Sequence, residues 1–190
     1  PLYLKDINKI VDKIISKKHA KEIFEKIKPN KHIKSQDIDK NYKNIKEGVN
    51  TTHYVIIDKD GNMVSNTYSL NYSFGIAKAV PGAGFLLNNV VDDFTIKANQ
   101  PNAYGLIQDE ENLVGSNKQP LSSMAPTIVL DEYDRPILAT GSPGGSRIIT
   151  TVLQVILNYL EYHYNIATAV ASPRIHSQLW PDKVLYEEGI

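Results

Sequence analysis

The stretch Asn50-Thr51-Thr52-His53-Tyr54 opens the first strongly apolar run of the chain, after a polar, lysine-rich segment at 1–50. The residues from His53 to Ile57 are β-branched or aromatic without a clean polar alternation, a pattern typical of a central strand covered on both faces. Thr51 at the lip of such a strand would be held rigidly, which makes it a candidate nucleophile. Threonine is also common at strand edges. The stretch alone therefore favours a structural threonine, and the case for catalysis depends on residues further along the chain.

The composition is that of an ordinary soluble globular protein. The 190 residues are 42% apolar and 22% charged, and they are enough for one domain with its own core. No window approaches the roughly 18 apolar residues that a membrane span needs, so we expect no membrane-spanning segment in this chain. Cysteine is absent, which excludes disulfides, thiolate catalysis and cysteine metal sites.

Charge divides the chain into two parts. Residues 1–50 hold 13 Lys and 7 Asp or Glu, and the remainder holds 8 Lys or Arg and 14 Asp or Glu, so an arm of net charge +6 precedes a body of −6. A basic arm can indicate nucleic-acid binding. This arm has no arginine and interleaves its lysines with acids. We therefore expect attraction between arm and body, and no nucleic-acid partner.

Helical periodicity at 5–28 predicts two short helices in the arm, because the apolar face changes phase near Ser16. Ser16 is a suitable N-cap for the second helix, and Pro29-Asn30 is expected to end it. Residues 30–50 lack a sustained period. They are expected to form an extended linker that leads into Thr51.

Two hairpins and a long apolar helix set the expected fold class. An Asp-Gly pair within 59–62 predicts a hairpin between Val55–Asp58 and Met63–Leu70. The later elements expected, in order, are a hairpin of Pro126–Leu130 with Pro136–Thr140, a buried-face helix through Ile149, Val152, Leu153, Ile156, Leu157 and Leu160, a short helix at Asn165–Ala171 stopped by Ser172-Pro173, and a strand at Lys183–Tyr186. This order predicts an α+β fold with antiparallel sheet covered by helices.

A glycine-rich turn at 141–146 precedes the long helix. No serine in it has the Gly-x-Ser-x-Gly spacing of a lipase elbow, and no lysine follows Gly145 as in a P-loop. What remains is a pair of residues without side chains, Gly144 and Gly145, whose N–H groups could point at an anion at a helix N-terminus. Such a pair is an oxyanion hole in an acyl-transfer enzyme, or otherwise a simple glycine-rich start to a helix.

Other polar residues allow either binding or ordinary loop chemistry. Ser122 and Ser123 form a hydroxyl pair that could bind a carboxylate, although serines before a strand commonly make turns. Asp92 and Asp93 are adjacent and would point in different directions in an extended chain. One of them could bind an ammonium group, but the pair is a poor metal site. The histidines are too scattered for a ligand set, so we expect no metal and no cofactor.

Five motifs occur in an order that resembles the γ-glutamyltranspeptidase family, over a region from about Ala20 to the end of the chain. They are Thr51-Thr52-His53-Tyr54, Asn88-Asn89, Asp92-Asp93-Phe94, Pro120-Leu121-Ser122-Ser123-Met124 and Gly141-Ser142-Pro143-Gly144-Gly145. The resemblance implies an N-terminal-nucleophile hydrolase αββα sandwich, here as a partial chain. It also implies that 1–50 is a helical arm and linker from the end of a large subunit, that 51–190 is the catalytic small-subunit region, and that the large subunit of the same precursor is a partner.

The resemblance implies the chemistry as well. The precursor would cut itself between Asn50 and Thr51, which frees the Thr51 α-amine to act as a base for its own hydroxyl. The family transfers or hydrolyses γ-glutamyl groups of glutathione and related compounds, with amino acids, dipeptides or water as acceptors. The site residues implied are Thr51 as nucleophile, Ser69 orienting it, Gly144 and Gly145 at the oxyanion, Asn71 and Asp93 at the α-ammonium, Ser122 and Ser123 at the α-carboxylate, and Tyr104 as a lid within the aperiodic span 95–120.

One departure from the family pattern bears on the substrate. Val90 stands where the family usually has Gln or Glu beside the α-ammonium, which leaves the preferred donor open. Two alternatives stay open: the branch of the family that trims or transfers poly-γ-glutamate, which the Val90 departure suggests, and an unprocessed, catalytically silent relative that acts as an interaction module, which the unbroken sequence through Asn50-Thr51 suggests. The family's carboxylate-binding arginine lies upstream, so we expect this chain to be a piece of a longer precursor. The resemblance also implies a periplasmic or extracellular location.

Overall fold

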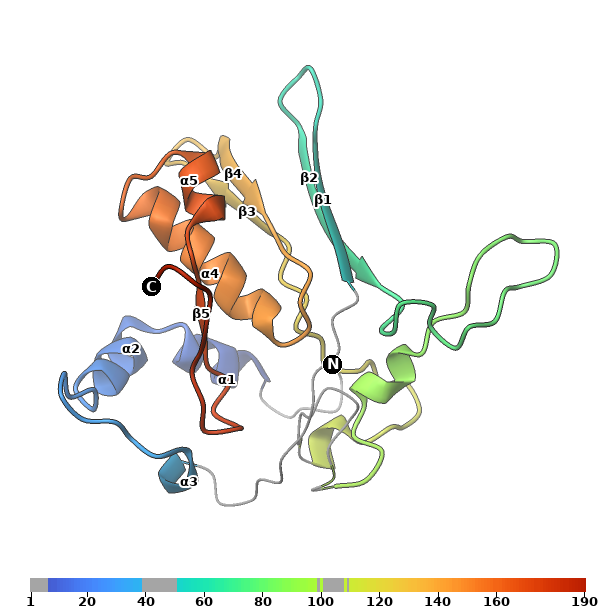
Figure 1. Cartoon of the computed structure of the whole chain (residues 1–190), viewed down its shortest axis with the longest axis horizontal. Helices are drawn as coiled ribbons and strands as arrows, with labels where there is room; N and C mark the ends of the chain where they lie inside the picture. Colours follow the sequence, from blue (N-terminus) through green and yellow to red (C-terminus); the bar gives the residue numbers. More distant parts are fainter. Residues whose placement is uncertain (1–6, 39–50, 99, 101–107, 109) are drawn as a thin grey trace.

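The computed structural model describes residues 7–38, 51–98, 100, 108 and 110–190 (Figure 1). Its main elements, in chain order, are α1 (Ile7–Ile14), α2 (Lys17–Phe24), α3 (Ser35–Ile38), β1 (Thr51–Ile57), β2 (Met63–Ser69), β3 (Thr127–Leu130), β4 (Pro136–Thr140), α4 (Arg147–Leu160), α5 (Ile166–Ala171), β5 (Ile175–His176) and β6 (Leu185–Tyr186). Two 3-10 helices, Val90–Asp93 and Glu110–Asn112, lie between β2 and β3. In the described residues, no helix is both long enough and apolar enough to cross a membrane.

Both predicted hairpins are confirmed. β1 pairs antiparallel with β2, from Thr51 opposite Ser69 to Ile57 opposite Met63. The Asp58 carboxylate closes the turn, because its Oδ1 accepts from the N–H groups of Asp60 and Asn62 at 2.9 Å each. β3 pairs antiparallel with β4, and the short β5 with β6. Each of these three sheets has two strands within the part of the chain that the structure describes.

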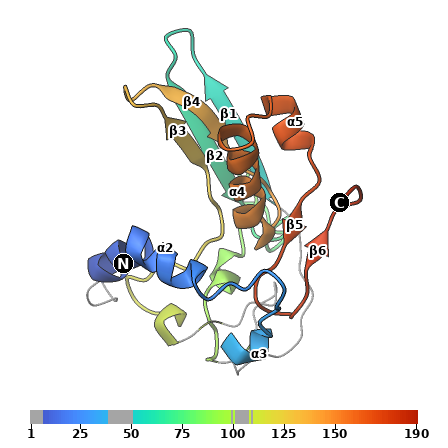
Figure 2. The same cartoon turned by 90° about the vertical axis from the view of Figure 1, so that its left-hand side faces the viewer.

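Helix α4 provides three of the six buried apolar residues in the described part of the chain. Its buried residues Ile148, Val152 and Val155 recur at i, i+4 and i+7, and Leu138 of β4 and Ala169 of α5, two elements that contact α4, are buried as well. Figures 1 and 2 show α4 beside the β3–β4 hairpin, and the β1–β2 hairpin on the far side of β3–β4. The Ser65 hydroxyl on β2 donates to the carbonyl of Thr140 on β4 at 3.0 Å, which ties the two hairpins together.

The predicted burial of α4 is only partly right. The predicted face includes Ile149, Leu153 and Leu157, but these side chains are 55%, 52% and 38% exposed. The buried stripe is the adjacent one, which starts one residue earlier, at Ile148. Because the helix is apolar along both stripes, its period cannot tell which stripe packs against its own chain.

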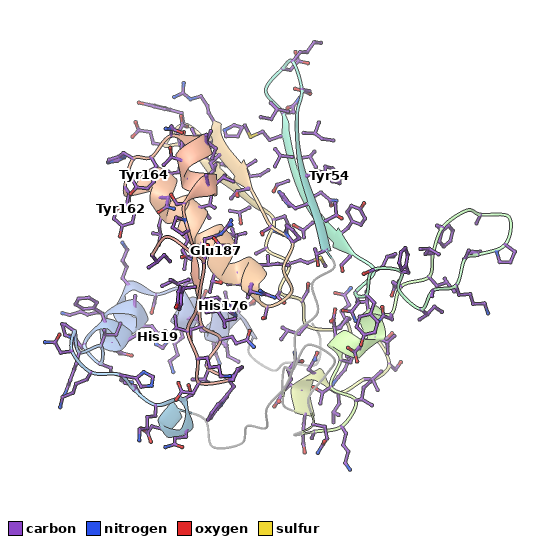
Figure 3. All side chains as sticks on the ribbon, in the orientation of Figure 1. His19, Tyr54, Tyr162, Tyr164, His176 and Glu187 are labelled. Atoms are coloured by element: carbon purple, nitrogen blue, oxygen red, sulfur yellow. The ribbon has the colours of Figure 1, made fainter. Side chains whose placement is uncertain are left out.

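β1 is not the doubly covered strand that its composition predicts. β2 is its one neighbour in the described residues, and Tyr54, Ile56 and Ile57 are exposed. Figure 3 shows Tyr54 on the side of the hairpin turned away from α4. β-Branched and aromatic residues indicate a strand whose faces can be buried. Whether a face is buried depends on which other elements pack against it, and the residues of the strand do not specify those elements.

The two predicted arm helices are confirmed, and Ser16 caps α2 by accepting from the N–H of His19 at 3.1 Å. α2 ends at Phe24, earlier than predicted, because the next residues make i→i−3 turns, such as Ile27 N–H to the Phe24 carbonyl at 3.0 Å. The segment expected to be extended contains α3. Ser35 at its start is buried, and its N–H donates to Asp182 in the C-terminal segment at 3.2 Å.

Helix α5 and strand β6 agree with their prediction, whereas the two-residue strand β5 was not predicted. The Asn165 side chain accepts from the N–H of Thr168 at 2.9 Å and caps α5, and the helix stops before Ser172-Pro173. Gln154 on α4 fixes β5, because its side-chain amide donates to the Ile175 carbonyl at 2.8 Å and accepts from the Ile175 N–H at 2.9 Å. The last strand, β6, is shorter than predicted and keeps its final residue, Tyr186.

Gly141, just after β4, lies directly against the His53 ring of β1, and a Cβ added at Gly141 would overlap that ring. The ring is held by a 2.8 Å hydrogen bond between its Nδ1 and Thr67 Oγ1, so it cannot turn aside freely. We expect Gly141→Ala to lower the free energy of unfolding by about 1–3 kcal/mol, as overpacking does. Urea unfolding followed by circular dichroism measures the change.

Gly115→Ala is the matched control, because a Cβ there would meet only the flexible Lys118 side chain, at 3.3 Å. We expect it to change the unfolding free energy by less than about 0.5 kcal/mol. Equal stability of the two variants would contradict the close packing of His53 on Gly141.

Candidate active site

A cavity of about 350 Å³ lies where the open end of the β1–β2 hairpin meets the start of α4. Seven residues predicted for the site line it, although they come from five separate stretches of the chain: Thr51, Ser69, Asn71, Asp93, Ser122, Ser123 and Gly145. Seven further residues complete the lining: Gln108, Leu121, Met124, Ser146, Ile148, Ile149 and Gln178. Hydroxyl, amide and carboxyl groups therefore gather on the wall of a partly apolar cavity, as in small-molecule sites.

Thr51 and Ser69 meet because the hairpin register sets them opposite each other. The Thr51 hydroxyl lies 3.4 Å from Ser69 Oγ, a long contact, and Ser69 Oγ also accepts from the N–H of Asn71 at 2.9 Å. Ser69 is thus fixed by the backbone that follows β2. Its hydroxyl can in turn restrict the direction of the Thr51 hydroxyl.

Asn71 is buried and adopts a left-handed backbone conformation, with φ of 73°, which Asn tolerates better than most residues. Its side-chain amide donates to the carbonyl of Asn89 at 3.2 Å, while the Asn89 side chain accepts from the N–H of Tyr72 at 3.0 Å. These reciprocal bonds join the end of β2 to the segment that leads into the Val90–Asp93 helix. Asn71 and Asp93 therefore reach the same cavity.

Asp93 is an acidic residue of the cavity lining, and its pKa departs clearly from the usual value. Burial, together with the negative charge of Asp92, raises the pKa of the Asp93 carboxyl to about 6. A cation that enters the cavity would stabilise the ionised form of this half-buried carboxyl group. Val90, one turn before Asp93, does not line the cavity.

The glycine-rich turn has the backbone geometry that only glycine adopts easily, with φ of 135° at Gly144 and 58° at Gly145. The two carbonyls accept from the N–H groups of Arg147 and Ile148 at 3.2 and 3.1 Å, so the turn leads directly into α4. Gly145 lines the cavity; Gly144 is buried beside it and does not. The N-terminal end of a 14-residue helix, with its partial positive charge, is thus aimed at the cavity.

Sequence reasoning missed a polar network behind this turn. Ser146 donates to the side-chain oxygen of Gln178, which also lies 2.8 Å from His176 Nε2, and His176 Nδ1 lies 2.8 Å from Thr150 Oγ1. His176, labelled in Figure 3, extends from β5 beside α4. Ser146 could have been suspected because it follows Gly145. Gln178 gives no local signal, because Ser146 lies 32 residues away from it in the sequence.

Two predicted residues, Asn50 and Tyr104, lie outside the described residues, so their predicted roles stay predictions. In the described ranges, no group of three or more His, Cys, Asp or Glu side chains gathers that could hold a metal ion. His53 is near β4 rather than in the cavity lining, and burial lowers the pKa of its imidazole.

The sequence matches known proteins over nearly its whole length. A family model described as Gamma-glutamyltranspeptidase matches residues 1–190. The glutathione hydrolase proenzyme of Escherichia coli (strain K12) is 47% identical over 176 residues, which cover 93% of this chain and 30% of that protein. The glutathione hydrolase proenzyme of Bacillus subtilis (strain 168) is 38% identical over 162 residues, which cover 83% and 26%. The chain thus spans less than a third of the length of these relatives.

Solved structures agree with the sequence matches. The gamma-glutamyltranspeptidase of Helicobacter pylori, crystallised as a threonine-to-alanine mutant, has a TM-score of 0.66 and 56% identity over 70% of this chain and 71% of that one. The Pseudomonas nitroreducens enzyme complexed with L-DON has a TM-score of 0.65 and 48% identity over 68% and 67%. These likenesses confirm the predicted α+β fold class, the N-terminal-nucleophile hydrolase αββα sandwich, of which this chain forms a part. The chain belongs to the gamma-glutamyltranspeptidase family.

Proposed function

We propose that this chain is the catalytic part of a precursor that transfers and hydrolyses γ-glutamyl groups, with Thr51 as the nucleophile. One observation carries this function: the Thr51 side chain shares a single cavity with a carboxyl group, a hydroxyl pair and the glycine-rich start of α4. A γ-glutamyl group presents an ammonium, a carboxylate and a reactive carbonyl, and each of these has a chemical counterpart in that cavity.

Self-cleavage would come first. The Thr51 hydroxyl attacks the carbonyl carbon of Asn50, the C–N bond breaks, and the hydroxyl proton passes to the departing nitrogen. Water then hydrolyses the resulting ester, which leaves a carboxylate on Asn50 and restores the Thr51 hydroxyl beside a free α-amine. The names of the relatives, glutathione hydrolase proenzyme, support a precursor of this kind.

Turnover would use the amine that cleavage releases. An α-amine has a reference pKa of about 7.7–8.0, so it can accept the Thr51 hydroxyl proton near neutral pH. The oxygen then attacks the γ-carbonyl carbon, and the Gly144 and Gly145 N–H groups stabilise the developing oxyanion. The leaving amine takes the proton and departs. The γ-glutamyl ester on Thr51 is resolved by water, an amino acid or a dipeptide, and Ser69 orients the nucleophile throughout.

The same cavity supports recognition of the donor. Asp93, with Asn71 beside it, would bind the α-ammonium, and Ser122 and Ser123 would bind the α-carboxylate. Because the pKa of Asp93 is raised from 3.8 to about 6, the protein with an empty cavity loses stability as the pH rises between these values, and an ammonium partner offsets that loss. Val90 has no polar side chain that could bind the α-ammonium, so recognition of this group would depend more heavily on Asp93 than in family members with Gln or Glu at that position.

The remaining roles extend beyond the described residues. Tyr104 would act as a lid over the cavity, and residues 1–50 would belong to the large subunit, which stays bound after cleavage. A periplasmic or extracellular site of action fits glutathione breakdown. Neither poly-γ-glutamate processing nor a silent interaction module is favoured by a specific observation, whereas the Escherichia coli and Bacillus subtilis relatives carry the name glutathione hydrolase proenzyme.

Thr51→Ala in the full-length precursor is the first test. We expect the precursor to remain uncut on a denaturing gel and the turnover of a γ-glutamyl anilide to fall by about 10⁴-fold or more, because nucleophile and base are both lost. Thr52→Ala is the matched control, because Thr52 is exposed and its side chain points to the opposite face of β1. Cleavage directly after Asn50 in the Thr51→Ala precursor would contradict the mechanism.

The raised pKa of Asp93 predicts a pH dependence. Below about pH 6 Asp93 is protonated and cannot pair with the ammonium, so kcat/KM for a γ-glutamyl anilide should bend downward there, in addition to any decline from protonation of the Thr51 amine. The bend should be absent in Asp93→Asn, whose kcat/KM we expect to be about 100-fold lower because a charge partner is lost. In Asp92→Asn the bend should move to lower pH, since Asp92 helps to raise the pKa.

A pH–rate profile of the three proteins provides the measurement. A bend near pH 6 that persists unchanged in Asp93→Asn would contradict the assignment of Asp93 to the ammonium.

A further inference from the structure

Asn112 does not line the cavity, yet its side chain is bonded to three stretches that do. Its amide nitrogen donates to the backbone carbonyl of Asp93 at 2.8 Å and also to the side-chain oxygen of Gln108. Its amide oxygen accepts from the N–H of Leu121 at 3.1 Å. Asp93, Gln108 and Leu121 all line the cavity, and Ser122 follows Leu121 directly.

The direction of the Asn112 amide follows from its partners. A backbone carbonyl can only accept and a backbone N–H can only donate, so the nitrogen must face Asp93 and the oxygen must face Leu121. Both hydrogens of the nitrogen are used. The side chain is therefore a complete three-way bridge whose two ends cannot be exchanged.

We infer that Asn112 is a positioning residue, which sets the distance between the group that binds the donor's α-ammonium and the group that binds its α-carboxylate. This inference rests on the proposed function. The ammonium and the carboxylate are attached to the same carbon, so Asp93 and the serine pair must converge on points a few ångströms apart. Productive sites hold such groups to within about 0.5 Å, through residues behind the contact surface. Asn112 joins the two stretches by one rigid side chain.

The turn that carries Asn112 has other supports, so the side chain can be tested separately from the fold. The Thr95 N–H donates to the Asn112 carbonyl at 2.9 Å, and the Val114 N–H to the Thr95 carbonyl at 3.4 Å. The Lys118 ammonium donates to the carbonyls of Glu111 and Leu113 at 3.0 and 3.1 Å. These bonds involve the backbone of the turn and remain when the Asn112 side chain is replaced.

Two donors separate positioning from general damage. A γ-glutamyl anilide uses both anchors, whereas a glutaryl anilide, which lacks the α-ammonium, has no need for their correct spacing. In the full-length precursor, Asn112→Ala should lower kcat/KM about tenfold for the γ-glutamyl anilide, mainly through KM, because the two anchors lose the side chain that sets their spacing. The glutaryl anilide should change by less than about twofold, and self-cleavage should be normal.

A second variant and a control complete the experiment. Asn112→Asp keeps the acceptor for Leu121 but cannot donate to the Asp93 carbonyl, so we expect the same selective loss with the side-chain shape preserved. It decides the question if Asn112→Ala does not fold. Glu111→Ala, an exposed neighbour in the same turn, should behave as wild type for both donors.

Equal losses on both donors in the Asn112 variants, or no loss at all, would overturn the positioning role while leaving the proposed function intact. A wild-type precursor that turns over no γ-glutamyl donor would instead overturn the proposed function, and the role of Asn112 with it.

Discussion

The register of the β1–β2 hairpin is the constraint on which the rest of the site depends. The Asp58 carboxylate holds the turn at two backbone N–H groups, and seven residue pairs then carry that register to Thr51 opposite Ser69. Because side chains alternate along a strand, a slip of one residue would turn Thr51 away from the cavity and bring Thr52 to it. The hydroxyl's position is therefore set at the far end of the hairpin, by a turn that has no chemical role.

The other walls of the cavity come from loops, and polar side chains hold those loops in place. The Asn89 side chain joins the end of β2 to the Val90–Asp93 helix, Asn112 joins Asp93 to the serine pair, and Gln178 joins the start of α4 to β5. A loop has no ladder of backbone hydrogen bonds to hold it, so its precision must come from side chains that bond to a neighbouring segment. The amide side chains around the cavity therefore hold the loops in place, while hydroxyls, an amine and backbone N–H groups carry out the proposed chemistry.

Local signals in the sequence predicted the helices and hairpins well, but they predicted poorly which faces of these elements are buried. The Asp-Gly turn, the Ser16 cap and the glycine pair before α4 act over a few residues, so each could be found from the sequence. The burial of Ile148 in place of Ile149, and the exposure of Tyr54 and Ile56, depend on which surface packs against each element. A periodic pattern marks an apolar stripe but does not say what covers it.

The same limit applies to the site. Thr51, Asp93 and the Ser122–Ser123 pair belong to short motifs of the family. Asn112 and Gln178 instead make bonds that span 19 and 32 residues, and only the folded chain brings these partners together.

The proposed chemistry requires that the Thr51 hydroxyl carry the γ-glutamyl group during turnover. Peptide mapping by mass spectrometry, after acid quenching of the processed full-length protein in the presence of a γ-glutamyl anilide, measures this step directly. We expect one added γ-glutamyl group on the peptide that begins at Thr51, and its loss when an acceptor amine is added before the quench. An adduct on Ser122, Ser123 or Ser146 instead, or steady turnover with no adduct at Thr51 under conditions that trap acyl esters, would contradict this role of Thr51.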